Sequence, residues 1–92
     1  MADINLDTKL NIPPQVMSRL VEDETVLLDL ASGLYFGLEG VGQTIWESLS
    51  SGRSLSETVA TITVEYDVDE TQAEADVVAF AGELVERGLL AK

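Results

Sequence analysis

The sequence predicts an α+β fold, in which a three-stranded antiparallel sheet is followed by three helices. Two observations indicate this order. Apolar and polar residues alternate before about residue 40, and apolar residues recur at three- and four-residue spacing after it. Alternation is the period of a strand, and the wider spacing is that of one helix face. Strands in one part of the chain and helices in the other are typical of the α+β class.

The first 12 residues show neither period, and we expect them to form a flexible N-terminal arm. The domain itself is then expected to span residues 13–92. Pro13 and Pro14 favour an extended backbone at its start. Residues 16–22 alternate weakly and predict the first strand, and the acidic run "EDE" at 22–24 predicts a turn after it.

The stretch "VLLDLASGLYFGL", residues 26–38, predicts a hairpin made of the second and third strands. Three alternating apolar residues lie on each side of "ASG". A three-residue loop with Gly33 in the left-handed conformation is a common hairpin connection. A two-residue loop would scatter the apolar side chains over both faces, so the longer loop is favoured. It puts all six on one face through the pairs Leu30–Leu34, Leu28–Phe36 and Val26–Leu38.

Each of the three expected helices carries an apolar stripe and has recognisable ends. The first is predicted over about residues 40–50, with Trp46 on its buried side. The second begins at Ser54, which forms a capping-box pattern with Glu57. The third begins after Asp69, a good N-cap residue, and stops at "RG", residues 87–88. The order and lengths of these elements fit a small winged helix-turn-helix-like domain.

The composition argues against catalysis and metal binding. The chain has no cysteine and no histidine, so it lacks thiolate nucleophiles, the commonest general base and the commonest transition-metal ligand. The serines between 48 and 56 have no histidine to activate them. The run "DVDE" at 67–70 lacks the rest of a calcium loop, and helix capping accounts for it. We therefore expect no enzyme activity, no metal and no cofactor.

The net charge of −12, from 17 acidic and 5 basic residues, narrows the choice of partner. Binding to DNA or RNA requires Lys and Arg to neutralise phosphates, so a winged-helix DNA-binding regulator is disfavoured. An acyl carrier protein is disfavoured because Ser54 follows an arginine where that class has an aspartate. The acidic surface either provides solubility or steers the protein toward a basic partner. No apolar run is long enough for a signal peptide or a membrane span, so a cytoplasmic protein is expected, with no membrane association.

The third strand is expected to form an unprotected edge of the sheet. Proteins usually protect sheet edges with charge or proline, and residues 34–38 carry neither. The face of the sheet that carries Tyr35 is also expected to be apolar, through Met17, Val21 and Leu27. Exposed apolar surface often marks a binding site. An open edge beside such a surface indicates a domain that adds a guest strand from a peptide.

Three segments together resemble the PqqD family, the peptide-recognition domains of pathways that make ribosomally synthesised, post-translationally modified peptides. These segments are "VLLDLASGLYFGLEGVGQTIWESL", "GRSLSETV" and "EYDVDETQAEADVVAFAGELVERGLL", and the resemblance covers about residues 13–90. Two departures concern the groove: the family usually has asparagine where Glu39 stands, and often a larger apolar residue near Ala81 or Gly82.

The resemblance implies that a leader peptide binds as an extra strand on the third strand, with its side chains in a groove beside the third helix. The resemblance implies that the protein binds partners and catalyses no reaction itself. The implied partners are the leader peptide, a leader peptidase of the split type, and a cyclase or a radical-SAM enzyme. A lasso-peptide pathway is favoured, and a PqqD-like chaperone role in pyrroloquinoline quinone biosynthesis is the alternative. The residues implied for peptide binding are Leu34, Tyr35, Phe36, Gly37, Asp76, Val77, Phe80 and Leu84.

Overall fold

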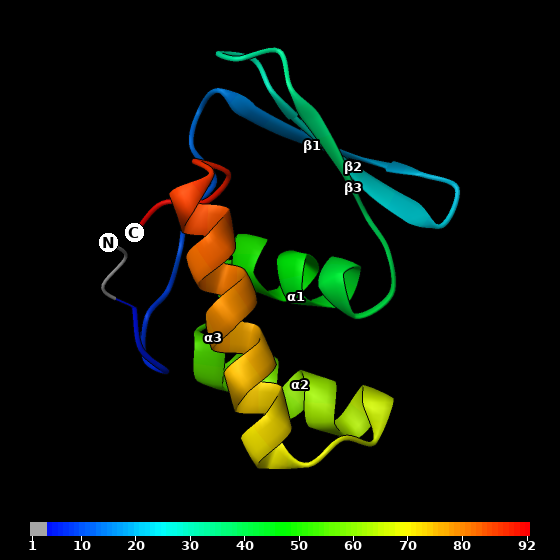
Figure 1. Ribbon diagram of the computed structural model, residues 1–92, viewed down its shortest axis with the longest axis vertical. Helices are drawn as coiled ribbons and strands as arrows, with labels where there is room; N and C mark the ends of the chain where they lie inside the picture. Colours follow the sequence, from blue (N-terminus) through cyan, green and yellow to red (C-terminus); the bar gives the residue numbers. More distant parts are fainter. Residues whose placement is uncertain (1–3) are drawn as a thin grey trace.

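The computed structural model describes residues 4–92 and confirms the predicted order of elements (Figure 1). The sheet lies at one end of the molecule, and all three helices lie on one side of it. Its strands are antiparallel in the order β1-β2-β3. The elements are β1 (Val16–Val21), β2 (Glu24–Asp29), β3 (Tyr35–Leu38), α1 (Gly40–Ser50), α2 (Leu55–Tyr66) and α3 (Glu70–Glu86).

The register of the β2–β3 hairpin differs by one residue from the predicted one. The structure pairs Leu28 with Tyr35 rather than with Phe36, and the loop has four residues, 30–33. The Asp29 N–H donates to the Leu34 carbonyl at 2.9 Å, and the Gly33 N–H donates to the Asp29 carbonyl at 2.8 Å. The Asp29 carboxylate also accepts hydrogen bonds from the Ala31 N–H and the Ser32 hydroxyl, which stabilises the longer loop. Gly33 has the expected positive φ, of 77°.

This shift reverses the two faces of β2, because a one-residue slip moves every side chain of a strand to the other side. Leu27, expected on the outer face, is fully buried against the helices. Val26 and Leu28, expected in the core, lie on the outer face with Tyr35. The faces of β3 are as predicted, since Phe36 and Leu38 pack against the core.

The core lies between the inner face of the sheet and the helices. Its largest fully buried side chains are Trp46, Leu10, Leu27, Ile45, Leu49, Leu55, Ile62, Leu89 and Leu90. The predicted helix ends are confirmed. The Ser54 hydroxyl accepts from the Glu57 N–H at 3.1 Å, and the Glu57 carboxylate accepts from the Ser54 N–H at 2.9 Å. The Asp69 carboxylate caps α3, and Gly88 ends it with φ 75°.

The N-terminal segment, expected to be a flexible arm, packs against the domain over residues 4–12. Residues 1–3 of the expected arm lie outside the described part of the chain. Leu10 is 1% exposed and belongs to the core. Asn11 and Ala91 exchange two backbone hydrogen bonds, of 2.6 and 2.8 Å, and Thr8 accepts one from the Leu55 N–H. The first 12 residues lack a strand or helix period because this segment is extended and pairs with the domain only through isolated β-bridges.

Candidate functional site

The free edge of β3 presents unpaired backbone groups. The Asp29 N–H bonds to the Leu34 carbonyl. Residues that bond to the neighbouring strand alternate with residues that do not. Phe36 and Leu38 therefore turn their N–H and C=O groups toward β2, and Tyr35 and Gly37 turn theirs outward. The predicted pairs Leu28–Phe36 and Val26–Leu38 would give the same assignment for β3, because the register differs only on the side of β2.

An apolar groove runs between this edge and α3. It encloses about 230 Å³. Leu84 and Leu89 are buried at its base, and Phe36 and Phe80 are half-buried. Phe80 also lies close to α1, because a Cβ on Gly42 would be 3.5 Å from its ring. The residues that line the groove are Phe36, Gly37, Leu38, Phe80, Glu83, Leu84, Arg87 and Leu89.

Two charged residues at the C-terminal end of α3, Glu83 and the C-cap residue Arg87, border the groove, and the sequence analysis missed both. The Arg87 guanidinium lies 5.6 Å from the centroid of the Phe36 ring, within range of a cation–π contact. It also donates to the Glu83 carboxylate at 3.1 Å. Arg87 was interpreted only as part of the helix end. Its spacing from Phe80, seven residues or two helical turns, is the signal that places it on the same face.

Half of the predicted site residues line the groove. Phe36, Gly37, Phe80 and Leu84 do so. Val77 does not, because it is completely buried in the core, and this corrects its expected role. Asp76 is exposed one turn before Phe80, where it accepts a hydrogen bond from the Gln72 side chain at 2.9 Å.

The two remaining predicted residues lie at the start of β3. Leu34 is 60% exposed and Tyr35 is 73% exposed. Neither lines the groove. Tyr35 instead belongs to the outer face of the sheet, opposite Leu28. Its backbone faces the free edge while its side chain does not point into the groove.

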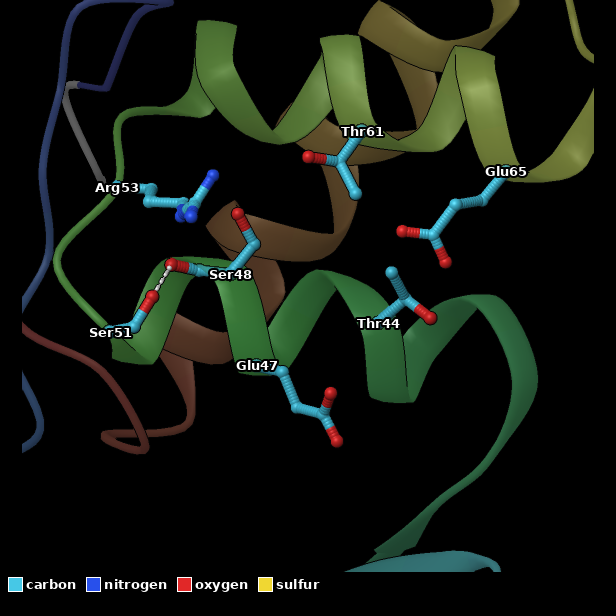
Figure 2. A pocket seen from close by; sticks show the side chains of 7 residues that line it. All are labelled: Thr44, Glu47, Ser48, Ser51, Arg53, Thr61 and Glu65. Carbon is cyan, nitrogen blue, oxygen red and sulfur yellow. Dashed lines mark hydrogen bonds between the residues drawn. The ribbon is translucent and has the colours of Figure 1, made fainter.

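A second, polar cleft lies between α1 and α2 (Figure 2). Figure 2 shows Arg53 at one end of it and Glu65 at the other. The hydroxyls along this cleft already bond to one another or to the backbone: Ser48 to Thr58 at 2.6 Å, and Ser51 to the Ser48 carbonyl at 2.8 Å. Within residues 4–92 every buried side-chain polar atom has a partner. The cleft therefore contains no buried side-chain polar atom that lacks a partner.

The fold, the open edge and the groove define a small domain suited to binding an extended peptide. The profile of the PqqD family, described as "Coenzyme PQQ synthesis protein D", matches residues 24–90. The chain therefore belongs to the PqqD family. No curated protein sequence matches the chain significantly. Over residues 4–92, none of the helices has the length and apolar character needed to cross a membrane.

Two solved structures share the fold over nearly the whole chain. One is TbiB1 in complex with the TbiA(beta) leader peptide, at 41% identity and a TM-score of 0.82. The match covers 87% of this chain and 93% of that one. The other is a lasso peptide synthetase B1 complexed with its leader peptide, at 29% identity and a TM-score of 0.85. It covers 92% of this chain and all of that one.

Proposed function

We propose that this protein binds the leader peptide of a ribosomally synthesised precursor as an additional strand on the free edge of β3. It presents the bound leader to a separate leader peptidase and to the maturation enzymes of a lasso-peptide pathway. One observation carries the proposal: an unprotected strand edge lies directly beside an apolar groove. The similarity to two structures that hold leader peptides supports it.

The geometry fits strand addition. Tyr35 and Gly37 together offer two outward N–H donors and two C=O acceptors to a guest backbone, and such main-chain bonds supply affinity. Alternate side chains of the guest point to opposite faces of the extended sheet. Those on the inner side enter the groove against Phe36 and Phe80. The apolar lining selects large apolar side chains there, and Arg87 and Glu83 border them.

The protein acts by binding and not by catalysis. Its sequence has no cysteine or histidine, and the groove lining consists of apolar residues and one ion pair. The chemistry belongs to its partners, a leader peptidase of the split type and a cyclase, which act on the held precursor in the cytoplasm. A role beside a radical-SAM enzyme is the second candidate, favoured by the family's description as a coenzyme PQQ synthesis protein.

Titration calorimetry with the leader, the core and the full precursor tests the proposal. Leader and full precursor should bind with the same affinity, and the core segment alone should not bind. The reason is that strand addition requires only the leader backbone and the side chains that fill the groove. Binding that depends on the core segment would contradict leader recognition.

A further inference from the structure

The carboxylate of Glu24 lies over Gly37 on the outer face of the sheet. Glu24 is the first residue of β2, and β2 pairs with β3 through Val26 and Gly37. Because Glu24 and Val26 are two residues apart, both side chains leave the sheet on the outer face. A Cβ on Gly37 would lie 2.9 Å from Glu24 Oε1, 3.1 Å from its Cδ and 3.5 Å from its Oε2. The carboxylate therefore lies where a side chain at position 37 would begin.

This carboxylate forms no salt bridge within residues 4–92. The salt bridge in this part of the chain joins Arg87 to Glu83, beside the groove on the other side of the sheet. Arg19 lies opposite Val26 on the outer face, but it is not within salt-bridge distance of Glu24. The negative charge of Glu24 is therefore available to a cation that approaches the free edge of β3.

A guest strand on this edge brings one of its side chains next to the Glu24 carboxylate. Directly opposed residues of neighbouring strands share a face of the sheet, with Cβ atoms about 4.5–5.5 Å apart. The guest residue opposite Gly37 therefore projects on the outer face. Gly37 offers it no side chain, so the carboxylate that lies over Gly37 is its neighbour. Opposite charges in such a cross-strand position attract, and like charges repel.

We propose that Glu24 selects lysine or arginine in the leader peptide at the position opposite Gly37, and rejects aspartate and glutamate there. The guest residues before and after this position point to the inner face, where the groove beside Phe36 and Leu38 takes apolar side chains. The recognised leader segment is thus a basic residue between two apolar residues. The inference rests on the proposed function, because only a strand on the β3 edge places a guest residue opposite Gly37.

The test measures the binding of synthetic leader peptides by fluorescence anisotropy. The parent peptide is the leader of the precursor encoded beside this protein, and each of its positions is replaced in turn by lysine and by glutamate. The ratio of the two affinities at each position is compared among the wild type, Glu24→Gln, Glu24→Lys and Glu65→Lys. Glu65→Lys is the matched control, because Glu65 is exposed on α2 and its replacement changes the net charge equally. Circular dichroism checks that all variants fold.

At one position the wild type should bind the lysine peptide about fivefold more tightly than the glutamate peptide, from one attraction gained and one repulsion avoided. Glu24→Gln should abolish this preference and Glu24→Lys should reverse it, whereas Glu65→Lys should leave it unchanged. The preference should also fall as salt is added, since both charges are exposed.

Two results would overturn the role of Glu24. One is a folded Glu24→Lys protein that keeps the wild-type ratio at every position, and the other is an equal effect of Glu65→Lys. Both leave the proposed function intact, because the peptides still bind. If no peptide binds to the wild type, the proposed function fails and the selection by Glu24 fails with it.

Discussion

Gly37 is the residue at which strand addition can be tested most directly. Its N–H points to the free edge of β3, so Gly37→Pro removes one donor and puts a ring where the guest backbone lies. Loss of one net hydrogen bond costs about 0.5–1.5 kcal/mol, and a stranded partner group adds about 1–3 kcal/mol. Together the two costs correspond to leader binding that is roughly 10- to 2,000-fold weaker, measured by calorimetry.

Gly37→Ala is the matched control for that variant. It adds a Cβ against the Glu24 carboxylate, as proline does, but it keeps the N–H. The contact is with the end of a flexible side chain, which can move aside. Gly37→Ala should therefore bind the leader nearly as the wild type does. A stable Gly37→Pro protein with wild-type leader affinity would exclude strand addition at this edge.

Phe80 divides its surface between the core and the groove, so Phe80→Ala should affect both stability and binding. Truncation of a fully buried phenylalanine costs about 3–5 kcal/mol, and a half-buried one should cost less. Leader binding should fall by about tenfold as the guest side chain loses an apolar contact. Urea unfolding and calorimetry on the same preparation separate the two effects. Wild-type leader affinity in the folded variant would show that Phe80 serves only the core.

At the scale of single elements, the N-terminus of α2 should show a pH dependence. The backbone hydrogen bond from the Ser54 N–H lowers the pKa of Glu57 below its ordinary value of 4.5. A lowered folded-state pKa stabilises the protein fully above the unfolded-state pKa, and this stabilisation is lost as pH falls through the lower folded-state value. Glutamine can still accept the capping hydrogen bond but does not titrate.

The wild type should therefore be more stable than Glu57→Gln at neutral pH, and the difference should shrink below about pH 4.5. Thermal unfolding of both proteins from pH 7 to pH 3 measures this difference. The other carboxylates titrate in both proteins, so their contribution to the pH dependence cancels in the difference. A difference that stays constant across the range would show that the Glu57 charge does not contribute.

The helix ends were predicted correctly from the sequence, and the register of β2 was not. Helix ends depend on residues three or four positions apart, such as Ser54 and Glu57, so their local signals were sufficient. The register of β2 depends on the hydrogen bonds that Asp29 makes within its loop, and alternation of apolar residues could not reveal those. Both faces of β2 are apolar, with Leu27 on one and Leu28 on the other, so the hydrophobic pattern fitted two registers.

The candidate site was also predicted only in part, since four of the eight predicted residues line the groove. The resemblance to the PqqD family implied Phe80 and Leu84, and both line the groove. It implied Val77 as well, and neither the resemblance nor the apolar spacing of α3 could separate this core residue from its neighbours at the groove. Arg87 was missed because a cation at a helix C-terminus already has an explanation. Its contact with Phe36 joins residues 51 positions apart, and only the tertiary fold brings them together.

At the scale of the whole molecule, the N-terminal segment should contribute substantially to stability. Leu10 is buried in the core although no regular element contains it. Leu10→Ala should lower the free energy of unfolding by about 2–5 kcal/mol, measured by urea denaturation. Ile12→Ala is the control: Ile12 is 38% exposed, and its truncation should cost clearly less. Equal, small effects of both substitutions would show that the segment behaves as the flexible arm that the sequence suggested.

The pairing of Asn11 with Ala91 also bears on how this domain can be connected to other polypeptides. Two segments 80 residues apart in the sequence are hydrogen-bonded side by side, so the segment that precedes β1 lies next to the segment that follows α3. Domains with adjacent ends tolerate insertion into a host loop and circular permutation. A permuted chain opened at the exposed turn around Gly52 would place α2 and α3 before the sheet. In this permuted chain β3 would still be followed directly by α1. The groove between β3 and α3 would form as before, although α3 would now precede β3 in the sequence.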